Sequence, residues 1–232
     1  MSFEQWLQSR LTAHGFPCGA IDGILGPITM AALKAFQRAK GLTVSGVADP
    51  ATVTALRLSS TASTAPIPAR DAEPAKPANV WPLQKNMTAF YGPVGTNQTA
   101  IDLPFSMVLA WDKSISIRKM TLHAKCAASA LRVLQRVAEI YTEKERADLG
   151  LNLFGGSLNV RKMRGGSSYS MHSWGAAIDF DPERNQLTWK APKARLSHAD
   201  AIPFWREWEA EGWVSLGRVA DRDHMHIQAA RL

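Results

Sequence analysis

The sequence predicts two folded parts: a small three-helix domain over residues 1–58 and an α+β domain over residues 80–232, a small antiparallel sheet with flanking helices. Three observations predict this division. Apolar residues recur at helical spacing in the first part. A stretch rich in Pro, Ala and Ser follows at residues 59–79. Beyond it, short apolar segments alternate with a longer helical pattern. With 232 residues, 46% of them hydrophobic, the chain is long enough for one good-sized domain and a small one.

The first part contains three helical segments. Residues 3–14 place apolar side chains on one face, and Gly15 is a natural end to that helix. Pro27 suits the first position of a second helix, which ends before Gly41, and a third short helix runs from about residue 50 to residue 56. The predicted core residues are Phe3, Trp6, Leu7, Leu11, Met30, Ala31, Leu33 and Phe36.

A pattern of turn and core residues gives this unit a family resemblance. Its members are Asp22, Gly23, Gly26, Pro27, Thr29, Ala32, Phe36, Gln37, Gly41, Leu42 and Gly46. The pattern resembles the peptidoglycan-binding domain found at the ends of many cell-wall hydrolases, which implies peptidoglycan as the partner. Each residue also has an ordinary structural role in a turn, a helix start or the core, so the pattern names no individual sugar or peptide contact.

The linker over residues 59–79 has four prolines and no periodic apolar face, which predicts a semi-extended connection. We therefore expect the two domains to move independently, so that binding by one raises the local concentration of the other at its substrate.

In the second part we expect a buried strand over residues 107–111 and a long helix over residues 122–141. Cys126 falls on the apolar face of that helix and is predicted to be a small core residue; with Cys18 in the other domain, no disulfide is indicated. A strand through Leu158 and Val160, a helix over residues 198–211, a turn and strand over residues 212–217 and a last strand over residues 223–228 complete the domain.

The stretch from Ser170 to Asp179 carries the chemistry. His172 and Asp179 stand seven residues apart, and strand alternation turns Asp179 away from the core while Gly175 leaves room beside it. His226, near the end of the chain, can supply a third ligand. Two imidazoles and one carboxylate with an open fourth position describe a catalytic zinc site. A histidine and an aspartate near a strand are, taken alone, more often an ordinary hydrogen-bonded pair.

The fuller pattern favours the metal. Ser-x-His-x-x-Gly-x-Ala-x-Asp is complete from Ser170 to Asp179, and Asp-x-x-His follows at Asp223 and His226. Over most of residues 81–232 the chain resembles the zinc D-alanyl-D-alanine carboxypeptidase and L-alanyl-D-glutamate endopeptidase family, which cuts the peptide part of bacterial peptidoglycan. The resemblance implies a hedgehog/DD-peptidase-like fold and zinc held by His172, Asp179 and His226.

The same resemblance assigns further roles. It makes Asp223 the general base, where many relatives have glutamate. It places a functional arginine ahead of the histidine motif, best matched by Arg161 and second by Arg164, to bind a substrate carboxylate or an oxyanion. Ser170 orders the loop, since no base partner for a nucleophile is indicated.

His224 is an alternative to Asp223 as the proton shuttle. In a regular strand His224 and His226 would share a face, which would put His224 in the cleft, where it could assist the oxyanion. Asp223 reaches the cleft only from a turn or a bulge, and the polar residues 221–223 favour such a turn.

Composition limits the other readings. The net charge of +7 suits an anionic partner. The sequence lacks the basic cluster with interleaved aromatics that would indicate a nucleic-acid-binding protein. No segment approaches the length of a membrane span. The N-terminus has no export signal, so we expect a monomer made in the cytoplasm that acts on the wall after release, as phage endolysins do. Two reactions remain as alternatives for the enzyme: cleavage of the L-alanyl-D-glutamate bond, which is favoured, and removal of terminal D-alanine. A wall-binding protein with a retained metal site is a third reading, against which the presence of Asp223 argues.

Overall fold

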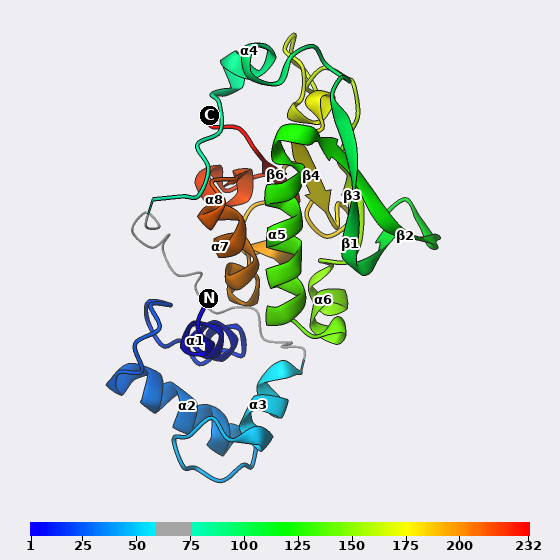
Figure 1. The fold of residues 1–232 in the computed structure, drawn as a ribbon. Helices are drawn as coiled ribbons and strands as arrows, with labels where there is room; N and C mark the ends of the chain where they lie inside the picture. Colours follow the sequence, from blue (N-terminus) through cyan, green and yellow to red (C-terminus); the bar gives the residue numbers. More distant parts are fainter. Residues whose placement is uncertain (59–75) are drawn as a thin grey trace.

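A computed structural model describes residues 1–58 and 76–232 (Figure 1). The predicted linker over residues 59–79 lies mostly outside the described residues, so its expected conformation stays a prediction. In the part of the chain that is described, no helix combines the length and apolar character needed to cross a membrane.

The N-terminal part contains three helices, as the sequence predicts. They are α1 (Phe3–Ala13), α2 (Pro27–Ala39) and α3 (Pro50–Arg57). Ser2 caps α1 by accepting a hydrogen bond from the backbone N–H of Gln5, and α2 and α3 begin with proline in the first turn. Their shared core contains Trp6, Leu7, Leu11, Leu33, Phe36 and Leu56. Phe3, by contrast, is exposed.

The second part is built on a six-stranded sheet in the order β2-β1-β3-β4-β6-β5. The strands are β1 (Gln98–Leu109), β2 (Asp112–His123), β3 (Leu153–Gly156), β4 (Ala177–Phe180), β5 (Val214–Ser215) and β6 (His226–Gln228). The sheet is mixed rather than wholly antiparallel, because β1 and β3 pair in parallel. Strand β2 and two helices lie between β1 and β3 along the chain, and such a long connection allows β3 to return in the direction of β1.

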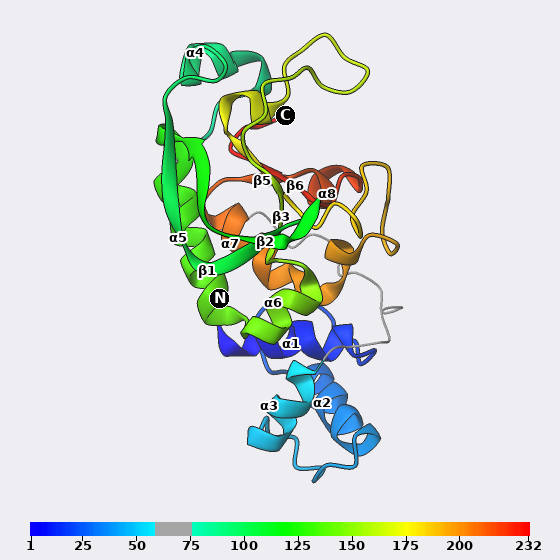
Figure 2. The same cartoon turned by 90° about the vertical axis from the view of Figure 1, so that its right-hand side faces the viewer.

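Helices cover the sheet and complete a single large apolar cluster. They are α4 (Met87–Tyr91), α5 (Ala124–Ile140), α6 (Glu143–Leu149), α7 (Ile202–Ala210) and α8 (Leu216–Ala220), with 3-10 turns η1 (Gln84–Asn86), η2 (Met171–Trp174), η3 (Arg195–Ser197) and η4 (Ala199–Ala201). Figures 1 and 2 show α5 and α7 side by side, and the two helices are in contact. Cys126 on α5 is fully buried, and burial raises the pKa of its thiol to about 12, so the prediction of a core cysteine is confirmed.

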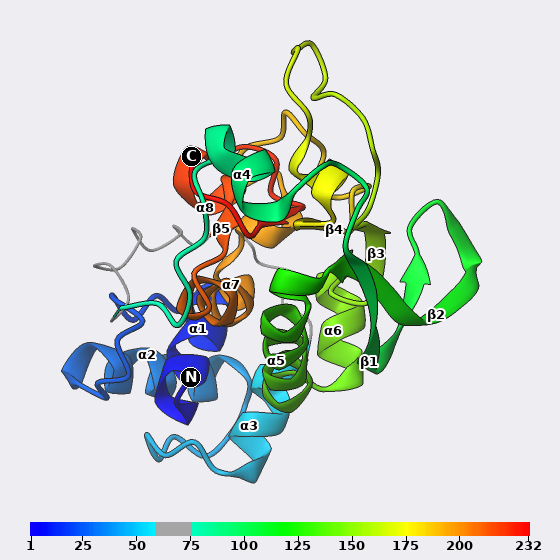
Figure 3. The ribbon, with the colours of Figure 1, turned by 45° about the horizontal axis from the view of Figure 1, so that its top comes forward.

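Several elements differ in position from those predicted from the sequence. The strand expected over residues 107–111 is the end of a long hairpin, β1 and β2, which extends away from the helices (Figure 3). The strand expected through Leu158 and Val160 is wrong; both side chains are exposed in a loop, and the strand is β3 just before them. Leu122 belongs to β2, which ends at His123, and does not start the helix; His123 caps α5 by accepting from the N–H of Lys125.

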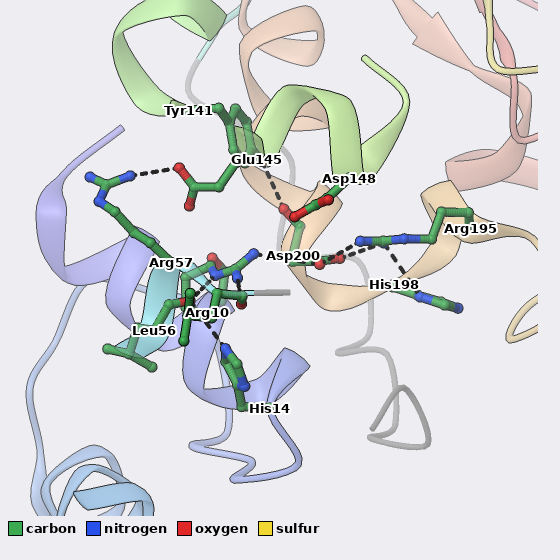
Figure 4. Close-up of polar contacts among 12 residues, drawn as sticks. Arg10, His14, Leu56, Arg57, Tyr141, Glu145, Asp148, Arg195, His198 and Asp200 are labelled. Atoms are coloured by element: carbon green, nitrogen blue, oxygen red, sulfur yellow. Dashed lines mark hydrogen bonds and ion pairs between the residues drawn. The ribbon is translucent and has the colours of Figure 1, made fainter. Parts of the chain in front are cut away.

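The two domains pack directly against each other, which differs from the expected independent motion. Helix α1 lies against η4 and α7, and a small apolar cluster of Ala13, Ile21, Ala199 and Ile202 bridges the two parts. Arg57 at the end of α3 forms an ion pair with Glu145 of α6, with 2.7 Å between Nη1 and Oε2 (Figure 4).

A buried ion-pair network lies at the centre of this interface (Figure 4). The Asp200 carboxylate accepts two 2.8 Å hydrogen bonds from Arg195 and lies 3.5 Å from Nη1 of Arg10. Arg10 also donates to the carbonyls of Leu56 and Leu58, both at 2.8 Å. Burial alone would raise the pKa of Asp200, but the hydrogen bonds and charge of Arg195, together with Arg10, lower it below its ordinary value. Arg10 therefore joins the end of α3 to the second domain.

Candidate metal centre

The His172 side chain is carried by η2, a turn fixed from both ends. Ser173 in the turn donates its hydroxyl to the carbonyl of Arg161 at 2.8 Å, which ties η2 to the preceding loop. Gly175 ends the turn with φ of +66°, and a Cβ there would lie 2.3 Å from the side chain of Gln98. The motif glycine is therefore required by both backbone conformation and space.

Strand register brings Asp179 and His226 together. β4 and β6 pair antiparallel with Asp179 opposite His226. The Asp179 Oδ1 atom lies 2.9 Å from His226 Nδ1 and 3.2 Å from His172 Nε2, and the two ring nitrogens are 3.2 Å apart. Ligands at 2.0–2.1 Å in a tetrahedral zinc site are separated by roughly 3.3 Å. The three atoms predicted as ligands therefore converge at a spacing that fits a small divalent cation.

Hydrogen bonds on the far side of each ring set the tautomers that a metal requires. Nδ1 of His172 lies 3.1 Å from the carbonyl of Ser157, so it carries the proton and leaves Nε2 free. Nε2 of His226 lies 3.2 Å from Oε1 of Gln228, so this ring keeps its proton there and presents Nδ1 to the cluster. Gln228 is fixed in turn by donating to the carbonyl of Ala230.

The electrostatics favour an ionised carboxylate. Burial opposes the charge on Asp179, but the charges and hydrogen bonds of His172 and His226 hold the pKa of Asp179 well below its usual range. Burial likewise opposes charge on His226, while Asp179 raises the pKa of that imidazole. One carboxylate and two imidazoles are a donor set suited to zinc and related transition metals.

Asp223 lies beside this cluster. It stands in the turn before β6 with φ of +53°, outside the strand, which is the departure from alternation that the sequence favours. Its Oδ1 atom is buried and has no hydrogen-bond partner among the residues that the structure describes. Burial raises the pKa of Asp223, and so does the negative charge of Asp179. The charges of His226 and His172 lower it in part. A buried carboxylate oxygen without such a partner calls for an explanation, and a water or substrate atom at the cluster would provide one.

A cleft of about 340 Å³ opens onto the cluster. Its lining residues are Trp111, Gly155, Gly156, Ser157, Leu158, Asn159, Arg161, His172 and Asp179. The structure thus brings the predicted Arg161 to the site. Arg164, the second choice, is exposed and does not line the cleft.

The sequence comparison concerns the first domain. Residues 5–56 match the family described as "Putative peptidoglycan binding domain". No curated protein matches the chain. The match covers α1 to α3 and supports peptidoglycan as a binding partner and a cell-wall association for the protein.

The peptidoglycan-binding domain lies at the opposite end of the molecule from η2, which carries His172 (Figures 1 and 2). The domain contacts the second domain through the ion pairs of Arg10 with Asp200 and of Arg57 with Glu145.

His224 is not brought to the cleft. Because β6 begins only at His226, strand alternation does not extend to His224, and the expectation that the two side chains share a face is wrong. The His224 ring lies over Gly217, with Nε2 3.0 Å from Asp221 Oδ1, and lines a separate pocket of about 220 Å³ with His198. Burial lowers the pKa of His224.

Two residues of the site escaped the sequence reasoning. Gln228 could have been found from its i+2 spacing to His226, since both side chains then point to one face of a strand. Trp111 belongs to no motif, and only the fold of the β1–β2 hairpin places it in the cleft.

Proposed function

We propose that the protein is a zinc-dependent peptidase that hydrolyses an amide bond in the peptide stems of peptidoglycan. The convergence of His172, Asp179 and His226 beside Asp223, whose buried Oδ1 has no partner within the described residues, carries the proposal. The match of residues 5–56 to a peptidoglycan-binding domain supports the choice of substrate. The resemblance of the second domain to the zinc carboxypeptidase and endopeptidase family points the same way.

A bound zinc would supply a Lewis acid that polarises the scissile carbonyl and lowers the pKa of a water molecule. Asp223 accepts a proton from that water through its free Oδ1 and donates it to the departing amine. Burial raises the pKa of Asp223, which makes its carboxylate a stronger proton acceptor than an exposed aspartate. Arg161, at the cleft, binds a carboxylate of the stem peptide.

Within this proposal the favoured bond is L-alanyl-D-glutamate, and removal of terminal D-alanine is the alternative. The protein then acts as a monomeric endolysin, made in the host cytoplasm and active on the wall after release. Both bonds place a carboxylate on the C-terminal side of the cut, where Arg161 can receive it.

The test is mass spectrometry of muropeptides after digestion of purified peptidoglycan. We expect fragments ending at L-alanine and new D-glutamate amino termini. Asp223→Asn should abolish most of this release, whereas Asp221→Asn is a matched control, since that carboxylate in the same loop faces Ala191 and His224 instead. Loss of a single D-alanine would identify the carboxypeptidase, and unchanged muropeptides with zinc-loaded protein would refute the proposal.

A further inference from the structure

Trp111 is exposed in a way that the other tryptophans are not. Of the eight tryptophans, all within the described residues, six are buried. Trp189 is half-buried beneath the ammonium group of Lys193. Trp111 alone exposes most of its side chain, 65%, and it does so at the cleft that contains His172 and Asp179. Large exposed aromatics at a concave site are typical of ligand contacts.

The Trp111 ring is presented on an anchored tip. It lies in the two-residue turn of the β1–β2 hairpin, where Leu109 pairs with Asp112. The preceding N–H of Ala110 donates to the carbonyl of Phe154 at 2.9 Å, and the Phe154 ring backs Trp111 with 6.2 Å between centroids. Beyond the turn, Lys113 forms a 2.6 Å ion pair with Glu183. The ring is therefore held at the cleft while most of its surface stays open.

The chain segment from residue 155 to residue 161 contacts the surroundings of Trp111, then two of the candidate metal ligands, and ends at Arg161. The segment from residue 155 to residue 161 begins beside Phe154, under Trp111. Gly156 then pairs with Asp179, and the next carbonyl, at Ser157, accepts from His172. The segment ends at Arg161, tied to Ser173. Trp111 and Arg161 thus lie at the two ends of this segment of the cleft, and His172 and Asp179 contact the part between them.

The size of the cleft limits which part of the substrate can enter it. A volume of about 340 Å³ is at the small end for ligand sites, enough for a short piece of peptide. Gly155, one of its lining residues, cannot carry a side chain, since a Cβ would lie 2.9 Å from the Cβ of Asp179. A bulky group next to the cleaved bond must therefore lie at the rim, where Trp111 is exposed.

We infer that Trp111 stacks on a sugar ring of the glycan strand, on the opposite side of the cleaved bond from Arg161. This inference rests on the proposed function. In peptidoglycan the sugar is attached to the amino end of the stem, and a carboxylate follows on the carboxyl side of the first amino acid. A site with an aromatic face at one end and a guanidinium at the other suits an amide close to the sugar. Trp111 accordingly makes the enzyme prefer stems that still carry their sugar.

The test compares two substrates of the full-length, zinc-loaded protein: a disaccharide-linked stem peptide and the same N-acetylated peptide without sugar. The readout is the ratio of their kcat/KM values. We expect Trp111→Ala to lower this ratio about tenfold, the effect of losing one aromatic stacking contact, and Trp111→Phe to keep most of it. Ile115→Ala is the matched control, since Ile115 is an exposed apolar residue of the same hairpin that does not line the cleft.

An unchanged ratio in Trp111→Ala would overturn the inference, because a merely structural role would lower both values alike. If the wild type cleaves neither substrate, the proposed function fails. The role of Trp111 is then decided by calorimetric binding of the disaccharide-linked peptide. About tenfold weaker binding by Trp111→Ala supports the sugar contact, and equal binding refutes it.

Discussion

Replacing Asp200 with asparagine removes the negative charge that Arg10 and Arg195 share inside the domain interface. Asp200 is 1% exposed and Arg10 is 2% exposed, so the two guanidinium groups would face each other with little water to screen them. Breaking a buried ion pair from one side costs about 3–5 kcal/mol of folding stability. Asparagine keeps one acceptor oxygen for Arg195, which is itself partly accessible, so we expect about 3 kcal/mol.

The assay is urea unfolding of the full-length protein, followed by circular dichroism. Asp102→Asn is the control, because Asp102 belongs to an exposed ion pair with Lys119 at 3.6 Å and should give no measurable change. A double-mutant cycle with Arg10→Met isolates the contact across the interface. A loss below about 0.5 kcal/mol in Asp200→Asn, with no coupling to Arg10→Met, would refute the docked arrangement.

Three further results are expected. Asp223→Asn should retain zinc and lower kcat by about two or more orders of magnitude, as for loss of a general base, and His224→Ala should cost less; the reverse order, with zinc intact in both, would make His224 the base. Gln228→Leu should weaken zinc affinity about 10- to 100-fold in chelator competition, since His226 loses the acceptor that fixes its tautomer, and unchanged affinity would exclude this role. The pKa of Asp200 in the folded protein lies below its ordinary value of 3.8. The stability that its charge contributes is therefore complete above that pH and is lost as the pH falls through the folded pKa. Unfolding curves between pH 6 and about pH 3 should show this loss of stability, and Asp200→Asn should make it smaller.

The sequence predicts the helices of the first domain because their signals are local. Pro27 starts α2, and apolar spacing marks the buried face of each helix. The convergence of the three candidate ligands was predictable for a related reason: motif spacing places His172 and Asp179 on adjacent elements, and His226 was chosen as the third member of the set.

Features that depend on long-range pairing were not predictable. The hairpin that carries Trp111 forms because two 12-residue strands pair, and their sequence has no marked turn signal at Ala110 and Trp111. The position of His224 depends on where β6 begins, and a shift of this boundary changes which face a side chain occupies. The docking of the two domains rests on Arg10 meeting Asp200, two residues far apart in the chain.

The most direct test of the account is a zinc titration of metal-free protein, with hydrolysis of purified peptidoglycan as the readout. If His172, Asp179 and His226 hold the ion that enables the reaction, activity should rise from near zero and level off at about one zinc per chain, and His226→Ala should show neither tight binding nor the rise. Full activity of the metal-free protein, or stoichiometric zinc binding by His226→Ala, would contradict it.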